Sequence, residues 1–244
     1  GASAGIGDAT ARRIVELGGR VVLNARRAEK LASLCEELGA DRAAVVAGDA
    51  SDSETVDAML DAAESIFGGA ADLVVVNAGV GLNGGVLSSD DTKWESMVKL
   101  NVVGAMRLMR RSAERMLSSI EKRGDWQERA HDIVVLGSTV GRHISPFSGS
   151  YGATKFAVHG AAEALRREIC GKGVRVSVVE PGLVVSEFQA GAGYDPEWFE
   201  GLKERFGPVL EPADVAETVV FIASQQARVH LADVLVRATR QDYP

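Results

Sequence analysis

Short apolar stretches alternate with amphipathic stretches along almost the whole chain, and this alternation limits the folds that the chain can adopt. Apolar runs of strand length predict β-strands at 21–24, 43–47, 73–77, 133–136, 174–179 and 231–236, with helices between them. Strands separated by helices form a parallel sheet that helices cover. We therefore predict an α/β fold with a doubly wound parallel sheet and helices on both faces. A length of 244 residues with 46% hydrophobic content indicates one domain over residues 1–244.

Composition excludes several classes of function. The net charge of −7, without any basic stripe, argues against nucleic acid as a partner. Cys35 and Cys170, the only two cysteines, lack the spacing of a metal or redox site, so no metal is expected. No apolar run reaches the roughly 18 residues that a membrane span needs, so no membrane partner is expected. Since no signal peptide is visible, we expect a cytoplasmic protein.

The chain opens on a glycine-rich turn, Gly1-Ala-Ser-Ala-Gly5-Ile-Gly7, ahead of a helix predicted from Asp8 to Leu17. Glycines let backbone amides approach a phosphate closely, and the helix N-terminus adds partial positive charge. The turn therefore predicts a pyrophosphate site. Its spacing differs from the common Gly-x-Gly-x2-Gly fingerprint, and a glycine-rich turn by itself is usually only a turn.

Tyr151 and Lys155 form the most informative pair of polar residues. On a helix, residues four positions apart are neighbours, so the ammonium is predicted to lie near the phenol. A positive charge at that distance lowers the pKa of a phenol by about two units, toward neutrality. The pair therefore predicts a tyrosine that acts as a general acid and base, with Ser138 thirteen residues upstream.

Separated motifs along the chain resemble those of the short-chain dehydrogenase/reductase family, in its NADP-preferring branch. They are the glycine turn, Asn77-Ala78-Gly79, Asn101, Ser138 with Tyr151-x3-Lys155, and Pro181-Gly182. Their order and spacing match the family over essentially the whole length. The resemblance implies a Rossmann-type fold whose first strand, with a threonine, is missing ahead of Gly1. Val76 and Ser186 also depart from the usual asparagine and threonine, and the Ser186 hydroxyl is expected to bond the nicotinamide carboxamide as the threonine does.

The resemblance also implies roles for individual residues. The catalytic tetrad would be Asn101, Ser138, Tyr151 and Lys155. Asn101 would orient Lys155 through a water molecule; the alternative is that it satisfies backbone groups within its helix. Many members are homotetramers or homodimers, so we expect a homo-oligomer. Together with the glycine turn, the cofactor-binding residues would be Gly1, Ser3, Gly5, Ile6, Gly7, Arg26, Arg27, Asp49, Ala50, Asn77, Ala78, Gly79, Tyr151, Lys155, Pro181, Gly182, Val184 and Ser186.

Charge at the end of the strand at 21–24 predicts the choice of cofactor. NAD-binding proteins of this fold place a carboxylate there, whereas a 2′-phosphate needs cations. The sequence there is Asn24-Ala25-Arg26-Arg27, which favours NADP(H) over NAD(H). The alternative is that these arginines are solvated residues at the start of a helix. Asp49, with Ala50 beside it, is expected near the adenine or else is a solvated turn residue.

The predicted function is NADP(H)-dependent hydride transfer between nicotinamide and a 3-oxo or 3-hydroxy acid, a semialdehyde or a ketone. A nonenzymatic NADP-binding sensor, or an epimerase or dehydratase, are the alternatives. Arg142 and His143 are either substrate contacts or surface loop residues. Residues 187–207 are predicted to form a lid over the substrate. The aromatic side chains of this lid, Tyr194, Trp198, Phe199 and Phe206, either line the pocket or pack in the core. His159 is interpreted as a packing residue.

Overall fold

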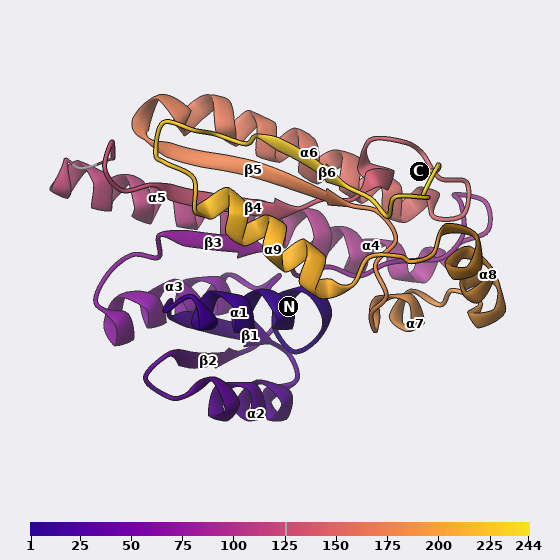
Figure 1. Cartoon of the computed structure of the whole chain (residues 1–244), viewed down its shortest axis with the longest axis horizontal. Coiled ribbons are helices and arrows are strands. Elements are labelled where there is room, and N and C mark those ends of the chain that lie inside the picture. Colours follow the sequence, from indigo (N-terminus) through magenta and orange to yellow (C-terminus); the bar gives the residue numbers. More distant parts are fainter. Residues whose placement is uncertain (125) are drawn as a thin grey trace.

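A computed structural model describes residues 1–124 and 126–244 and shows a parallel β-sheet between layers of helices (Figure 1). The strands are β1 (Val21–Ala25), β2 (Ala43–Ala47), β3 (Leu73–Val76), β4 (His131–Leu136), β5 (Val174–Pro181) and β6 (Asp233–Val236). β1 pairs with β2, while β3, β4, β5 and β6 pair in that order, and every pairing is parallel. The predicted strands are confirmed, although β4 and β5 are longer and β6 shorter than the apolar runs indicated.

Helices follow the strands and cover both faces of the sheet. They are α1 (Gly5–Glu16), α2 (Ala28–Leu38), α3 (Ser53–Phe67), α4 (Trp94–Val98), α5 (Ala105–Arg123), α6 (Gly149–Ile169), α7 (Phe188–Ala192), α8 (Pro196–Phe206) and α9 (Pro212–Ala223). A π-helical segment, Lys99–Gly104, joins α4 to α5. α3, α5 and α6 bury one apolar cluster against β3, β4 and β5, and α9 buries another on the opposite face. The predicted α/β fold with helices on both faces is therefore confirmed.

The central strands β4 and β5 are buried, and most of their side chains are β-branched or apolar. All positions of β4 and β5 are buried, as is typical of strands covered on both faces. Two of the polar exceptions form an ion pair: Arg175 Nε lies 2.7 Å from Asp132 Oδ1, and Nη2 lies 2.6 Å from Oδ2. Arg175 Nη1 also donates to the carbonyl of Val229 at 2.7 Å. This buried ion pair thus connects the beginnings of β4 and β5 to the loop before β6.

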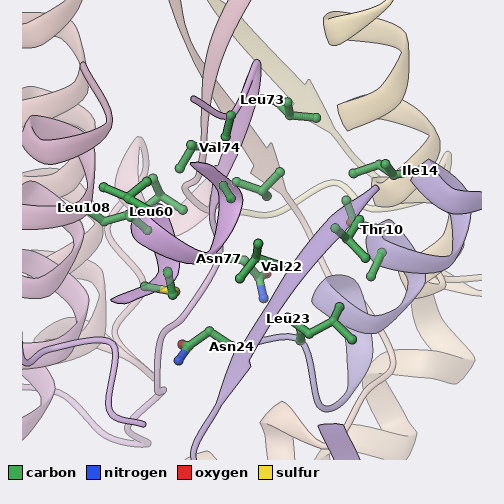
Figure 2. A pocket seen from close by; sticks show the side chains of 18 of the residues that line it. Thr10, Ile14, Val22, Leu23, Asn24, Leu60, Leu73, Val74, Asn77 and Leu108 are labelled. Carbon is green, nitrogen blue, oxygen red and sulfur yellow. The ribbon is translucent and has the colours of Figure 1, made fainter. Parts of the chain in front are cut away.

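An apolar groove of about 640 Å³ separates β1 from β3. Figure 2 shows that Val22 of β1 and Val74 of β3 line it, with Leu60 and Leu108 from the helices. Within the described residues β1 pairs only with β2, and β3 only with β4, so the two strand edges that border the groove carry no strand partner. Over the described parts of the chain, no helix is long and apolar enough to cross a membrane.

Candidate active site

A cleft of about 770 Å³ lies at the carboxyl ends of β1, β3, β4 and β5. Ligands bind at this edge in open parallel sheets. Of the predicted site residues, all except Gly7 and Asn101 line the cleft. Those that line it are Gly1, Ser3, Gly5, Ile6, Arg26, Arg27, Asp49, Ala50, Asn77, Ala78, Gly79, Ser138, Tyr151, Lys155, Pro181, Gly182, Val184 and Ser186. The fold therefore brings together residues that lie far apart in the sequence, from Gly1 to Ser186.

In the glycine turn, Gly1 and Gly7 are packed too tightly to carry a Cβ. Gly5 has a φ of 60°, in the left-handed region, and α1 begins there rather than at the predicted Asp8. A Cβ on Gly7 would contact the Gly1 carbonyl and would lie 2.6 Å from Asn77 Nδ2. Asn77 Nδ2 donates to the Gly1 carbonyl at 3.1 Å, so the asparagine after β3 holds the turn. This packing leaves the backbone of the turn accessible at the start of α1.

Tyr151 and Lys155 lie in successive turns of α6, and their side chains are buried, with residues 8% and 7% exposed. Lys155 Nζ is 5.7 Å from the centre of the Tyr151 ring and donates to the Leu136 carbonyl at 2.6 Å. Leu136 is the last residue of β4, so α6 is packed with its lysine against the end of the strand that precedes Ser138. The predicted proximity of phenol and ammonium is confirmed.

The electrostatic effect on Tyr151 differs from the prediction. Burial raises the pKa of Tyr151 well above its usual value, and nearby Tyr194 adds to this, while a hydrogen bond with Ser138 acts in the opposite direction. Burial also lowers the pKa of Lys155 to about 8. Loss of hydration thus outweighs the lysine charge, contrary to the expected lowering. At neutral pH the phenol is protonated, the form that can donate a proton.

Ser138 is held by a histidine that the sequence analysis assigned to packing. The backbone N–H of Ser138 donates to His159 Nε2 at 3.2 Å. Gly137 and Gly141 make room for the ring, since a Cβ on either would collide with His159. The interpretation of His159 as a packing residue was therefore incomplete. Its ring packs against the two glycines, and it also accepts a hydrogen bond from the loop that contains Ser138. The glycines on both sides of Ser138 were the available sequence signal.

Arg142 does not line the cleft and pairs with a buried carboxylate instead. Its guanidinium donates to both oxygens of Glu180, with Nε 2.7 Å from Oε2 and Nη2 2.6 Å from Oε1. The Glu180 side chain is 1% exposed. Neither Arg142 nor the exposed His143 is among the residues that line the cleft. The geometry therefore does not support a role for Arg142 or His143 as a substrate contact.

Asn101 lies in the π-helical segment, and its amide binds the loop after β3. Its Oδ1 accepts from the Val80 N–H at 2.9 Å, and its Nδ2 donates to the Val80 carbonyl at 2.8 Å. Nδ2 also donates to Thr154 Oγ1 at 3.0 Å, on the helix that carries Tyr151 and Lys155. Asn101 therefore satisfies backbone groups, as the alternative role predicted. These groups belong to Val80, in the loop that follows Asn77-Ala-Gly79, and not to the helix that carries Asn101.

The two arginines after β1 differ in their contacts. Arg26 is exposed, whereas Arg27 Nη1 lies 2.7 Å from Glu187 Oε2, and Arg27 Nε donates to Ser3 Oγ at 3.1 Å. Lys30 of α2 lies 2.9 Å from the other Glu187 oxygen. The contacts with Lys30 and Arg27 hold the pKa of Glu187 well below its usual range. A cluster of cations at this end of the cleft, paired with one carboxylate, is thus a feature that sequence spacing did not reveal.

Two other cofactor-binding candidates have local structural roles. Asp49 Oδ1 accepts from the Ser51 N–H at 2.8 Å, which lowers its pKa and stabilises the turn after β2. The Ser186 hydroxyl accepts from the Phe188 N–H at 3.2 Å at the start of α7. Both residues also line the cleft. Asp49 is therefore a turn residue, as one of its two predicted roles had it, and it also lines the cleft.

The segment at 187–207 forms α7 and α8 beside the cleft. Tyr194, Trp198, Phe199 and Phe206 all line it, although Phe206 is also buried, with 4% exposure. Phe188 contacts the catalytic candidate directly, with its ring centre 5.4 Å from that of Tyr151. The segment thus covers the Tyr151 end of the cleft with aromatic side chains.

Comparison with known proteins agrees with this geometry. A family model described as short chain dehydrogenase matches residues 1–196. An oxidoreductase of Staphylococcus aureus (strain MW2) is 31% identical over 237 residues, which cover 97% of this chain and 94% of the relative. A glycine betaine reductase of Emericella nidulans is 33% identical over 239 residues, 97% of this chain but 18% of that protein.

Solved structures share the fold over nearly the whole chain. The closed form of serine dehydrogenase complexed with NADP+ superposes with a TM-score of 0.87 and 29% identity, covering 100% of this chain and 94% of that one. The 3-ketoacyl-(acyl-carrier-protein) reductase from Brucella melitensis, complexed with NADH, gives a TM-score of 0.87 and 27% identity, covering 98% and 95%. With its parallel sheet, its glycine turn and its buried tyrosine and lysine in one cleft, the chain belongs to the short-chain dehydrogenase/reductase family of oxidoreductases.

Proposed function

We propose that this protein transfers a hydride reversibly between NADP(H) and a carbonyl or secondary alcohol substrate, with Tyr151 as the general acid and base. The observation that carries this proposal is the convergence of Ser138, Tyr151 and Lys155 on one cleft that also contains the glycine turn. The solved relatives bound to NADP+ and to NADH support the choice of a nicotinamide cofactor.

The residues of the cleft fit such a cofactor. The glycine turn lines the cleft at the start of α1, and its Gly1 and Gly7 have no room for a Cβ, as a turn that holds a pyrophosphate requires. Arg26, Arg27 and Lys30 gather at the end of β1, where a 2′-phosphate needs positive charge. Lys155 and Ser186, further along the cleft, would hold the nicotinamide ribose and carboxamide. When bound, the cofactor supplies or accepts the hydride.

The chain's own residues would handle the proton. As a carbonyl is reduced, negative charge grows on its oxygen, and the protonated Tyr151 hydroxyl donates its proton there. Ser138, hydrogen-bonded to Tyr151, donates to the same oxygen and stabilises the charge. Asn101 holds the loop after β3 against the helix of Tyr151, which fixes the floor of the site. In the oxidation direction Tyr151 takes the proton back.

Substitution of Tyr151 tests this proposal. We expect Tyr151→Phe to lower NADPH-dependent carbonyl reduction by at least about a hundredfold, the usual contribution of a general acid. NADPH binding, measured by fluorescence titration, should be retained because the ring stays in place. Tyr243→Phe makes the same chemical change elsewhere in the cleft and serves as the matched control. Near-normal turnover by the Tyr151 variant would remove tyrosine from the mechanism.

The same measurements distinguish the other functions considered. A protein that binds NADPH but oxidises none of it in the presence of a panel of aldehydes, ketones and 3-oxo acids is a cofactor sensor. An isomerase or dehydratase would convert its substrate without net loss of the NADPH absorbance. Steady consumption of NADPH that depends on Tyr151 is the result expected from hydride transfer.

A further inference from the structure

Aromatic side chains dominate the end of the cleft beyond Tyr151. Trp198 of α8 packs against Phe147, with ring centres 5.6 Å apart, and stacks on Tyr194 at 5.5 Å. Tyr194 is hydrogen-bonded to Ser148, one residue before α6, and lies near enough to Tyr151 to affect its phenol. The three rings therefore form a continuous wall, here called the aromatic wall, that leads to the candidate proton donor.

The aromatic wall is open to solvent rather than filled by the protein. Phe147 is 53% exposed and Trp198 is 37% exposed, although both line the cleft. Phe206, by contrast, is buried and contributes to packing. Large apolar side chains left exposed inside a cleft are typical of a binding surface. The wall therefore offers flat apolar area to a ligand that reaches Tyr151.

Positive charge at this end of the cleft is already neutralised. Among the described residues that line the cleft, the basic ones are Arg26, Arg27, Lys155 and Arg205. The first two follow β1 at the far end, and Lys155 is buried beneath Tyr151. Arg205 Nη2 lies 2.7 Å and 3.0 Å from the two oxygens of Asp242. A substrate carboxylate would therefore have to compete with Asp242 for its cation.

We propose that the cleft selects carbonyl substrates that carry an aryl or similarly bulky apolar group, and that it discriminates against substrates with a carboxylate at that position. The inference rests on the proposed function, since it assumes that the carbonyl lies at Tyr151. It narrows the predicted substrate range from acids, semialdehydes and ketones to the apolar ketones and aldehydes. The aryl group would stack on Trp198 and Phe147, while Arg205, already paired with Asp242, offers a substrate carboxylate no free cation.

A matched pair of methyl ketones tests the inference. Benzylacetone and levulinate share the same carbonyl and spacer, but one ends in a phenyl group and the other in a carboxylate. With NADPH, we expect kcat/KM for benzylacetone to exceed that for levulinate by about tenfold or more, because the ring is buried on the aromatic wall and the carboxylate finds no unpaired cation among the described residues there. An equal or higher value for levulinate would overturn the inference.

Variants of Trp198 and Asp242 test whether these residues cause the preference for benzylacetone, and a variant of Phe221 is the control. Trp198→Ala should lower kcat/KM for benzylacetone about tenfold by raising KM, with NADPH binding unchanged. Phe221→Ala removes an exposed aromatic ring on α9, outside the cleft, and should change kcat/KM for neither ketone. Asp242→Asn frees Arg205, so kcat/KM for levulinate should rise several-fold while that for benzylacetone stays constant. Insensitivity of benzylacetone to loss of Trp198 would contradict the proposal.

Failure of the inference can be distinguished from failure of the proposed function. Binding of benzylacetone is followed by isothermal titration calorimetry in the presence of NADP+, which needs no turnover. Saturable binding that Trp198→Ala weakens supports the aromatic wall even if neither ketone is reduced, and hydride transfer would then be the claim that fails. Absence of binding, or tighter competition by levulinate, overturns the inference whatever the activity.

Discussion

Glu187 bridges two parts of the cleft that are 160 residues apart, because its Oε2 lies 2.7 Å from Arg27 Nη1. Its other oxygen lies 2.9 Å from Lys30. Glu187 is the residue immediately before α7, so this contact joins the segment that covers the cleft to the end of β1. The Glu187 carboxylate is thus paired with Arg27 and Lys30, two of the cations that we propose to bind the 2′-phosphate of NADP(H).

Neutralising Glu187 should therefore strengthen binding of NADP(H) selectively. We expect Glu187→Gln to lower the Kd for NADP+ by about three- to fivefold, since an exposed ion pair competes only weakly with the phosphate. The Kd for NAD+ should stay the same, because NAD+ lacks the competing phosphate. Fluorescence titration measures both. Glu29→Gln removes the same charge from the first turn of α2 and is the control; equal gains for both cofactors would indicate only a general charge effect.

His159 should act as a positioning residue for Ser138. We expect His159→Leu to lower kcat for carbonyl reduction about tenfold, because the Ser138 N–H loses its acceptor. His159→Gln keeps an acceptor on a side chain of similar reach and should retain most of the activity. Unchanged kcat in the leucine variant would return His159 to a purely packing role.

The pH dependence separates this role from packing. Burial lowers the pKa of His159, while Glu180 raises it, and Lys155, Arg142 and Asp233 also face the ring. His159 is therefore neutral at pH 7, and protonation in acid converts Nε2 from an acceptor to a donor. We expect kcat to fall in acid, at a pH below the ordinary imidazole pKa because burial lowers the pKa of His159, and this acid limb to be absent from the glutamine variant.

Lys155 should make cofactor binding depend on pH in the alkaline range. Its pKa of about 8 means that the amine is cationic below that pH and neutral above it. Since the charged form is the stronger donor to ribose hydroxyls, we expect the Kd for NADPH to rise as pH increases from 7 to about 9.5. The 2′-phosphate titrates near pH 6, outside this window. Lys155→Met should bind more weakly and without this dependence.

The buried pair between Asp132 and Arg175 should contribute to stability rather than to activity. Arg175→Met leaves the Asp132 carboxylate buried without its partner, which costs about 3–5 kcal/mol in the free energy of unfolding. Replacing Asp132 with Leu as well should recover part of this loss. Urea denaturation measures both. Glu114→Gln, which breaks an exposed pair with Arg110 on α5, should cost less than about 1 kcal/mol.

Much of the fold and of the site was predictable because the relevant signals are local. Apolar runs marked each strand within a few residues, since burial on both faces of a parallel sheet demands continuous apolar side chains. Asn77 and Ser138 follow strands directly, so parallel strands must bring them to the same edge. Helical spacing placed Lys155 beside Tyr151 without further knowledge.

The sequence by itself thus determined the order of strands and helices, the family and the residues that meet in the cleft. Only the tertiary structure decided what surrounds them: Glu187 on Arg27, His159 on Ser138, and Arg142 turned toward Glu180. Tertiary packing also decided that burial raises the pKa of Tyr151, against the prediction from the nearby charge. The physical reason is that periodicity and spacing act over a few residues, whereas desolvation and pairing of charges depend on which distant segments pack together.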